Sequence, residues 1–285
     1  MGSPTPSSHL VPVDGLTYHY LRWGEPDRPP VLLLHGLRSY AATWQPLAAA
    51  LSDDHLVIAP DLRGRGRSSW DPGRNYFTRT YVRDVAALAE SLGLARFSIV
   101  GHSLGGAVGY AYAARHPEQV GALVVEDIGP GSSSETAGAD RILREIGRTP
   151  DSFDSLDAVR AYWRDIRPGI TKQALDSRLE HTVRRGADGS WVWTLDMAGI
   201  GAARSAEDPD GPVDLWAAVQ SLRCHTLVVR GDRSDFLTAA VCTEMARRQP
   251  LLDWVEVPGA GHYVHDDNPD VFNRLVTRFL ARGEP

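Results

Sequence analysis

Lysine is nearly absent from this chain, whose 285 residues include only one, Lys172. Lys172 lies mid-chain in a polar stretch of helical character. A Schiff base, a pyridoxal-phosphate linkage and a Walker-type phosphate loop each depend on a lysine amine at a defined position. We therefore exclude these chemistries for this protein.

Other scarce features narrow the class of protein further. The two cysteines, Cys224 and Cys242, have no metal-binding or redox spacing, so we expect buried or partly buried thiols in a reducing cytoplasm. No apolar run approaches the roughly 18 residues that a membrane helix requires. Residues 1–9 are rich in serine and proline and lack the basic and apolar parts of a secretory signal, so we expect a loose tail there.

The charge pattern argues against a nucleic-acid partner, because the formal net charge is −6 and the arginines are scattered. With 42% hydrophobic residues, the chain is long enough for one large domain, with or without an insertion. The sequence contains neither a nucleotide-binding motif nor a metal cluster. We expect a small-molecule substrate, no cofactor, no metal and no membrane association, in a monomer or homodimer.

Short apolar runs alternate with amphipathic stretches along most of the chain. This alternation predicts a largely parallel sheet with helices on both faces, in which ligands bind beyond the carboxyl ends of the strands. The predicted strands cover residues 16–23, 31–34, 56–59, 97–100, 122–125, 226–229 and 254–257. The predicted helices cover residues 44–51, 80–92, 104–116, 239–248 and 269–281.

Residues 131–221 break this alternation, because they contain helical patches and several aromatic residues but no strand-length β-branched run. We predict a helical lid here, inserted into a core formed by residues 1–130 and 222–285. Trp163, Trp191 and Trp193 are expected to line an apolar substrate pocket under this lid. Alternatively, the aromatic residues form the small core of the lid itself.

The segment Gly101-His102-Ser103-Leu104-Gly105 joins a predicted buried strand directly to a predicted helix. A Gly-x-Ser-x-Gly turn in this position forces the serine into a strained backbone conformation and exposes its hydroxyl. The flanking glycines leave room for the sharp bend. The pattern predicts that Ser103 is a nucleophile.

A serine hydroxyl needs a base to become a good nucleophile. His262 follows the last predicted strand, which places it at the same edge of the sheet as Ser103, and we predict that it is the base. His35 is interpreted as a structural residue that braces its loop, and His102 is expected to point away from the nucleophile. His265 is expected either to rim the pocket or to lie on the surface.

An oxyanion hole requires two backbone N–H groups that point at one carbonyl oxygen. Leu104, at the start of the helix after Ser103, is expected to supply the first. Leu37, which directly follows His35-Gly36, is expected to supply the second.

Four motifs together resemble the α/β-hydrolase superfamily over nearly the whole chain. The resemblance implies an eight-stranded, mostly parallel sheet, a helical cap after the sixth strand, a serine nucleophile and a late histidine. It also implies that Asp61 and Arg63 belong to a turn whose role is mainly structural. The motifs are Leu34-His35-Gly36, the run from Asp61 to Ser68, the run from Gly101 to Gly106, and Gly259-Ala260-Gly261-His262 followed by Asn268-Pro269.

The acidic residue departs from the commonest pattern of that superfamily. Most members carry it three residues after the glycine that ends the seventh strand, but here Gly231 is followed at that distance by Ser234. Asp127, at the end of the sixth strand, resembles the acid of a subset of esterases in which the later position is a serine or asparagine. We predict that Asp127 is the acid, and Asp235 is the alternative. If Asp127 is not the acid, we expect it to be a helix cap or a lid hinge. Glu126 should face the opposite way.

These residues predict a serine hydrolase that cleaves a carboxylic ester, lactone or thioester through an acyl-enzyme. The expected substrate is small to medium in size and apolar or aromatic. A serine rather than an aspartate nucleophile disfavours haloalkane dehalogenase and epoxide hydrolase chemistry. Carbon–carbon bond hydrolysis and cofactor-free perhydrolysis use the same triad and stay open, as does a non-catalytic ligand-binding receptor.

Overall fold

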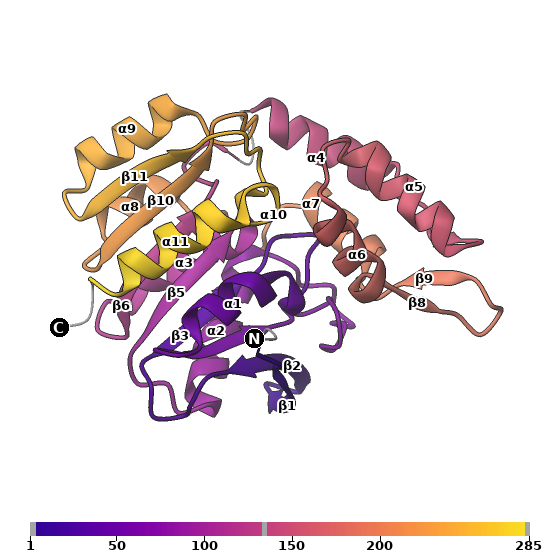
Figure 1. Ribbon diagram of the computed structural model, residues 1–285, viewed down its shortest axis with the longest axis horizontal. Helices are drawn as coiled ribbons and strands as arrows, with labels where there is room; N and C mark the ends of the chain where they lie inside the picture. The colour runs from indigo at the N-terminus through magenta and orange to yellow at the C-terminus, as the bar shows by residue number, and fades with distance from the viewer. Residues whose placement is uncertain (1–3, 133–135, 283–285) are drawn as a thin grey trace.

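The computed structural model describes residues 4–132 and 136–282 and is built around an eight-stranded sheet (Figure 1). The strand order is β1-β2-β4-β3-β5-β6-β10-β11, with β1 and β2 antiparallel to their neighbours and all other pairs parallel. The mostly parallel sheet predicted from the sequence is therefore confirmed. The strands are β1 (Ser7–Val13), β2 (Leu16–Trp23), β3 (Pro30–Leu34), β4 (Leu56–Pro60), β5 (Phe97–His102), β6 (Val120–Glu126), β10 (His225–Gly231) and β11 (Leu252–Val257).

The strand β1 was not predicted, and the expectation of a loose tail is wrong from Ser7 onward. β1 pairs with β2 through a hairpin whose turn residues, Asp14 and Gly15, have φ angles of 48° and 79°. Positive φ angles at both turn residues match the right-handed twist of the two strands that a two-residue hairpin joins. Pro12 is tolerated because β1 is an edge strand. Residues 1–3 of the expected tail lie outside the described residues.

Helices cover both faces of the sheet, as the sequence predicted. On one face lie α1 (Gln45–Leu51) and α11 (Pro269–Leu280), which pack against each other. On the other face lie α2 (Thr78–Ser91), α3 (Leu104–Arg115), α8 (Leu215–Gln220) and α9 (Ala239–Arg248). Two short helices, η1 (Ala41–Trp44) and α10 (Val264–Asp267), complete the core.

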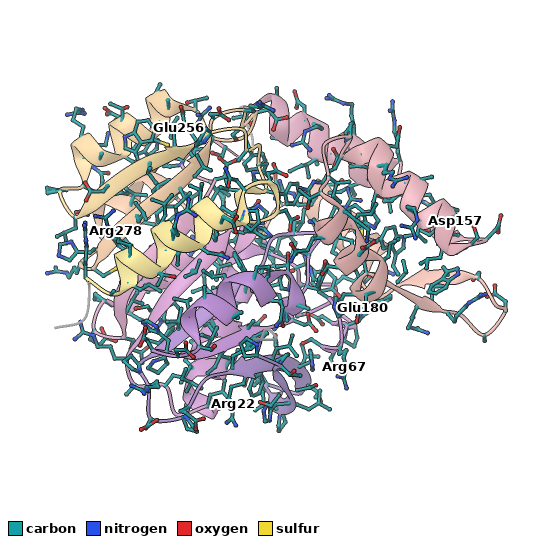
Figure 2. The ribbon with its side chains drawn as sticks, viewed as in Figure 1. Arg22, Arg67, Asp157, Glu180, Glu256 and Arg278 are labelled. Carbon is teal, nitrogen blue, oxygen red and sulfur yellow. The ribbon has the colours of Figure 1, made fainter. Side chains whose placement is uncertain are left out.

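Strand β3 shows why the sheet needs both helical layers. Val31 and Leu33 belong to the hydrophobic cluster with α1 and α11, whereas Leu32 and Leu34 belong to the cluster with α2 and α3. All four side chains are at most 1% exposed. Side chains alternate between the faces of a strand, so a continuously apolar strand must be covered on both sides. In Figure 2, labelled charged side chains such as Arg278 lie at the periphery of the molecule.

The described residues between β6 and β10 form five helices and a small antiparallel sheet of order β7-β9-β8. The small sheet was not predicted, because strands of two or three residues are too short to show a periodic pattern. The helix α8 packs against α3 of the core, so we propose that the inserted lid ends before α8 and not at residue 221. The inserted elements are α4 (Ala137–Gly147), β7 (Ser152–Phe153), α5 (Leu156–Ile166), α6 (Lys172–His181), β8 (Val183–Arg185), β9 (Trp191–Trp193) and α7 (Met197–Ser205).

A chain of ion pairs fastens this inserted segment to the core near the carboxyl edge of the sheet. Arg38 of the core lies 3.2 Å from Glu145 of α4, which also binds Arg141 at 2.8 Å. Arg141 in turn binds Asp235 of the core at 2.8 Å. Because Arg38 and Glu145 are largely buried, this link is expected to hold α4 more firmly than exposed ion pairs would.

Among the described residues, no helix is long and apolar enough to cross a membrane. Both cysteines, Cys224 and Cys242, are free and buried, as the sequence predicted.

Candidate active site

Ser103 lies at the apex of a sharp turn between β5 and α3, with φ 51° and ψ −113°. The turn depends on its glycines. A Cβ at Gly101 would lie 2.4 Å from the carbonyl oxygen of Gly105, and a Cβ at Gly105 would lie 2.1 Å from the carbonyl oxygen of Leu34. No larger residue fits at either position without moving the backbone, so the sequence Gly-x-Ser-x-Gly directly produces the strained serine.

The imidazole of His262 connects Ser103 to Asp127. Nε2 of His262 lies 3.0 Å from Oγ of Ser103, and its Nδ1 lies 2.8 Å from Oδ2 of Asp127. An ionised carboxylate can only accept, so Nδ1 carries the proton and donates it to Asp127. Nε2 is then free to accept the hydroxyl proton of Ser103. All three residues are buried.

Asp127 directly follows β6 and has a φ of 53°, a left-handed conformation that is uncommon for a non-glycine residue. Its carboxylate also accepts hydrogen bonds from the Gly231 N–H at 3.2 Å and from the Ser234 hydroxyl at 2.5 Å. Ser234, which occupies the usual place of the acid, therefore binds the carboxylate that reaches His262.

Asp235 has a different partner. Its two carboxylate oxygens accept hydrogen bonds from Arg141 at 2.8 and 2.9 Å. The guanidinium of Arg141 lowers the pKa of Asp235. Nδ1–H of His262 donates its hydrogen bond to Asp127, and Asp235 serves instead in the ionic link to α4.

Leu37 and Leu104, whose backbone N–H groups are expected to form the oxyanion hole, border the same cavity as Ser103. Leu104 is the first residue of α3, so its N–H has no partner within the helix and lies at the positive end of the helix dipole. The carbonyl of Leu37 accepts a hydrogen bond from Nε of Arg65 at 3.1 Å. This hydrogen bond fixes the peptide group that follows Leu37.

His35 braces this loop. Its Nε2 accepts from the Leu62 N–H at 3.0 Å, and its Nδ1–H donates to the carbonyl of Gly36 at 2.8 Å. Burial lowers the pKa of His35 to about 4, which keeps the ring neutral and able to accept.

A second histidine–carboxylate pair lies beside the first. His265 places Nδ1 2.8 Å from both carboxylate oxygens of Glu126, and its backbone N–H also donates to Glu126 at 3.0 Å. The backbone carbonyl of Glu126 accepts the N–H of Ser103 at 3.0 Å. Glu126 and Asp127, adjacent at the end of β6, thus hold His265 and His262 respectively, on opposite sides of the strand as predicted for Glu126.

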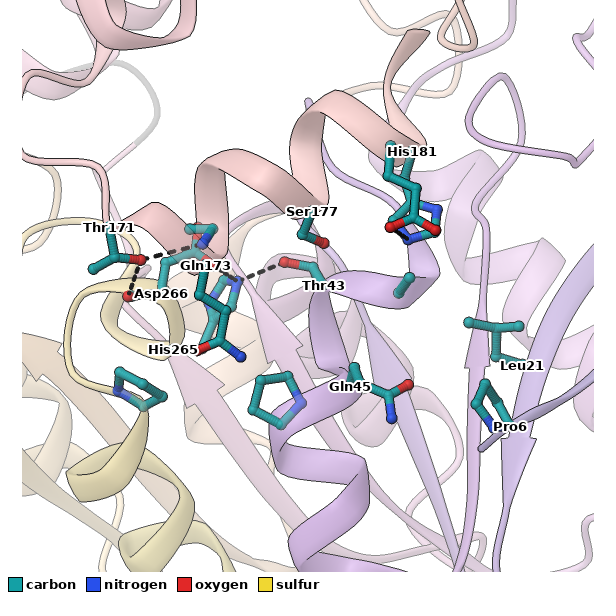
Figure 3. A pocket seen from close by; sticks show the side chains of 15 residues that line it. Pro6, Leu21, Thr43, Gln45, Thr171, Gln173, Ser177, His181, His265 and Asp266 are labelled. Atoms are coloured by element: carbon teal, nitrogen blue, oxygen red, sulfur yellow. Dashed lines mark hydrogen bonds and ion pairs between the residues drawn. The ribbon is translucent and has the colours of Figure 1, made fainter. Parts of the chain in front are cut away.

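His265 therefore neither rims the Ser103 cavity nor lies on the surface, since it is 5% exposed. Its Nε2 lies 3.0 Å from the hydroxyl of Thr43. Both residues border a separate cavity of about 410 Å³ between α6 and the η1–α1 segment, shown in Figure 3 with Ser177 on the helix side. His265 is buried because its ring is hydrogen-bonded to the buried carboxylate of Glu126.

His102 points away from Ser103, as expected, and contacts the loop that carries His262. Its Nε2–H donates to the carbonyl of His262 at 2.9 Å, and the two rings are 4.8 Å apart. Burial, together with the neighbouring His262 and His265, holds the pKa of His102 well below its usual range, so the ring is neutral. One possible ligand atom from each of His102, Glu126 and His265 lies within 4.8 Å of the others, which is a metal-ligand spacing. Hydrogen bonds account for Glu126 and His265, whereas Nδ1 of His102 is buried without a hydrogen-bond partner among the described residues.

Replacing Glu126 with glutamine should lower the free energy of unfolding by about 3 kcal/mol, because breaking a buried ion pair leaves one uncompensated charge. Burial disfavours the charged form of His265, but the carboxylates of Glu126 and Asp266 outweigh burial and raise its pKa. The unfolded histidine titrates near 6.5. The stabilisation is therefore fully present below pH 6.5 and is lost as the pH rises through the raised pKa.

Urea unfolding of the wild type and Glu126→Gln from about pH 6 to about pH 9 tests this expectation, since the difference in stability should shrink toward alkaline pH. Glu90→Gln, on the exposed face of α2, is the control. A difference in stability that stays constant across this range would contradict an ionised Glu126–His265 pair.

Ser103 opens into a cavity of about 670 Å³. Its wall is formed by the core and by the inserted segment, and it is mainly apolar. The large apolar side chains that line it are Leu37, Phe77, Leu104, Ile128, Ile142, Val213, Leu215 and Phe236. Phe236 was missed by the sequence analysis, and its ring lies 4.3 Å from the imidazole of His262. No local pattern distinguishes it from other buried aromatic residues.

The three tryptophans predicted to line this pocket lie elsewhere. Trp163 and Trp193 are 1% and 5% exposed and pack edge-to-face with ring centroids 5.9 Å apart. Phe153 and Tyr162 complete their cluster, while Trp191 is partly exposed on the small sheet. The alternative reading holds for this cluster: the inserted segment needs its own core, and its large aromatic residues fill it.

Comparison with known proteins agrees with this geometry. The sequence profile described as "Alpha/beta hydrolase family" matches residues 31–275. The chain belongs to the alpha/beta hydrolase family. It is 31% identical to a 2-(acetamidomethylene)succinate hydrolase of Mesorhizobium japonicum, covering 88% of each chain. It is 30% identical to esterase Rv0045c of Mycobacterium tuberculosis, covering 91% of this chain and 85% of the relative.

Solved structures show the same fold. A crystal structure of E-2-(acetamidomethylene)succinate hydrolase superposes with a TM-score of 0.86 at 28% sequence identity, covering 97% of this chain and all of the other. The resemblance inferred from four sequence motifs is therefore confirmed at the level of the family and of the fold.

Proposed function

We propose that this hydrolase cleaves a carboxylic ester, lactone or thioester of a small to medium substrate through an acyl-enzyme. The observation that carries the proposal is the continuous hydrogen-bonded path from Asp127 through His262 to Ser103. This path ends at a serine that faces an apolar cavity. It is the arrangement that turns a serine hydroxyl into a nucleophile toward a carbonyl carbon.

In the acylation step, Oγ of Ser103 attacks the substrate carbonyl while Nε2 of His262 takes the hydroxyl proton. Asp127 stabilises the imidazolium through the Nδ1 hydrogen bond and does not itself take the proton. The N–H groups of Leu37 and Leu104 stabilise the oxyanion. When the tetrahedral intermediate collapses, His262 gives its proton to the departing alcohol or thiol and Ser103 carries the acyl group.

In the deacylation step, a water molecule replaces the alcohol. His262 takes a proton from the water as it attacks the acyl carbonyl, and the same two N–H groups stabilise the second oxyanion. Collapse of this intermediate releases the carboxylic acid and returns the proton to Oγ of Ser103. For a lactone, the alcohol and the acid are parts of one opened product.

Two of the curated relatives support ester cleavage by their names, esterase Rv0045c and an sn-1-specific diacylglycerol lipase. Another is named a 2-(acetamidomethylene)succinate hydrolase, so relatives of similar identity are not all named as esterases. Carbon–carbon bond hydrolysis and perhydrolysis would use the same triad. Ester cleavage is preferred because the esterase and the lipase, two relatives of similar identity, are named for it.

The experiment that tests the proposal is hydrolysis of p-nitrophenyl acetate, butyrate and hexanoate with methanol as a competing acceptor. An acyl-enzyme predicts that the ratio of methyl ester to free acid depends on the acyl group and not on the leaving alcohol. Replacing p-nitrophenol with phenol in the same acyl series provides the comparison. Absence of turnover on every ester, in a folded protein, would overturn the proposal.

A further inference from the structure

Arg204 is the one basic side chain that lines the Ser103 cavity in residues 4–132 and 136–282. It lies in the last turn of α7, within the inserted segment. Its guanidinium has no hydrogen bond or ion pair with any residue in the described part of the chain. The side chain remains accessible, which is consistent with a position on the wall of an open cavity.

Other arginines around the site are engaged by the protein. Arg38 binds Glu145 at 3.2 Å, and Arg141 binds both Glu145 and Asp235 at 2.8 Å. Nε of Arg79 donates to a backbone carbonyl of the inserted segment at 2.7 Å. A guanidinium that borders the cavity yet has no such partner is available to a ligand.

The surroundings of Arg204 disfavour its positive charge. Burial lowers the pKa of Arg204, and the one ionisable group that opposes this effect is Tyr81. Arg204 is accessible from the cavity and has no carboxylate partner among the described residues, so its charge is uncompensated. An anionic group of a substrate would supply the missing charge.

Two carboxylates, Glu207 and Asp208, border the same cavity in the segment after α7. Asp208 accepts a hydrogen bond from the Asp210 N–H at 2.9 Å, and neither carboxylate is paired with Arg204. Their negative charge disfavours a doubly charged ligand such as a phosphate monoester. A single carboxylate matches one free guanidinium, because two parallel N–H groups can bind its two oxygens.

We propose that Arg204 binds a carboxylate of the substrate, so that the preferred esters carry a free carboxylate at the end of a short apolar chain. This inference rests on the proposed ester hydrolysis, because its kinetic test measures ester cleavage. The apolar walls around Ile128, Ile142 and Phe236 accept the chain, Ser103 attacks the ester carbonyl, and Arg204 holds the far end. Hemiesters of short dicarboxylic acids have this shape.

The test compares pairs of esters that differ only by a carboxylate in place of a methyl group. Monoethyl succinate is paired with ethyl butyrate, and monoethyl adipate with ethyl hexanoate, with ethanol release measured for each. The ratio of kcat/KM for the hemiester to that for the neutral ester is the readout. Arg204→Gln should lower this ratio by at least roughly tenfold, as expected for a lost hydrogen bond to a charged group, and Arg204→Lys should lower it less.

Arg144→Gln is the matched control, because Arg144 is an exposed arginine in the last turn of α4 and does not border the cavity. It removes the same charge from the inserted segment and should leave the ratio unchanged. An equal drop in both variants would show a long-range charge effect and overturn the proposal. An unchanged ratio in Arg204→Gln would also overturn it, while Ser103-dependent hydrolysis of the neutral esters would still support the proposed function.

A binding measurement separates the two proposals if no ester is cleaved. Calorimetric titration of Ser103→Ala with monoethyl adipate should show binding that is weakened at least roughly tenfold when Arg204→Gln is added. Binding with this dependence and no turnover of any ester would support the carboxylate site and overturn the proposed hydrolysis. Binding that is indifferent to Arg204 would overturn the carboxylate site.

Discussion

Replacing Ser103 with alanine is expected to lower kcat for p-nitrophenyl butyrate by roughly 10⁴-fold or more, because the covalent route is lost and only oxyanion binding remains. The KM should change much less, since the hydroxyl contributes little to ground-state binding. Initial rates at saturating ester, corrected for the uncatalysed reaction, measure this effect.

Labelling provides an independent readout of the same residue. Diisopropyl fluorophosphate should form one covalent adduct, and peptide mass analysis should place it on Ser103. Ser221→Ala, on an exposed serine at the end of α8, is the control and should retain both labelling and turnover. An adduct at a different serine, or full activity in Ser103→Ala, would remove the basis of the proposed mechanism.

Replacing Asp127 with asparagine should lower kcat by about 10³- to 10⁴-fold, as observed when the carboxylate of a Ser-His-Asp triad is removed. The amide N–H can donate a hydrogen bond to Nδ1 of His262, and this would favour the tautomer in which Nε2 carries the proton. Nε2 could then no longer accept the hydroxyl proton of Ser103. Ser234 and the Gly231 N–H would also lose part of their acceptor.

Asp235→Asn is the matched comparison, because Asp235 differs from Asp127 in its partner and not in its chemistry. It should change kcat by less than about tenfold, since it removes a partly exposed ion pair with Arg141 and leaves His262 untouched. Circular dichroism and thermal unfolding of both variants check that the fold is retained. A large loss in Asp235→Asn together with a small loss in Asp127→Asn would reverse the assignment of the acid.

Local sequence patterns were sufficient for much of the fold. A strand of four apolar residues such as Val31–Leu34 must be covered on both faces, and the glycines around Ser103 admit only one sharp turn. These features depend on residues close together in the chain. The strand β1 was missed because its two serines and its one proline are unfavourable in most strands. The proline is tolerated here because β1 lies at the edge of the sheet.

Side-chain partners between distant segments required the tertiary structure. Asp127 and Asp235 are both aspartates near a strand end. They differ in their partners, because Asp127 binds His262 whereas Asp235 binds Arg141 on an inserted helix. The burial of Trp163 in the inserted segment depends equally on what packs around it.

The sequence by itself determined the alternation of strands and helices from β2 to β6, the turn that strains Ser103, and the edge of the sheet where His262 arrives. Only the tertiary structure decided which carboxylate holds that histidine, that Glu126 holds a second one, and that Arg204 lines the cavity with no ionic partner among residues 4–132 and 136–282. The reason is physical. Backbone conformation responds to neighbours within a few residues, whereas the partner of a polar side chain is whatever group the packing of remote segments brings within hydrogen-bond distance.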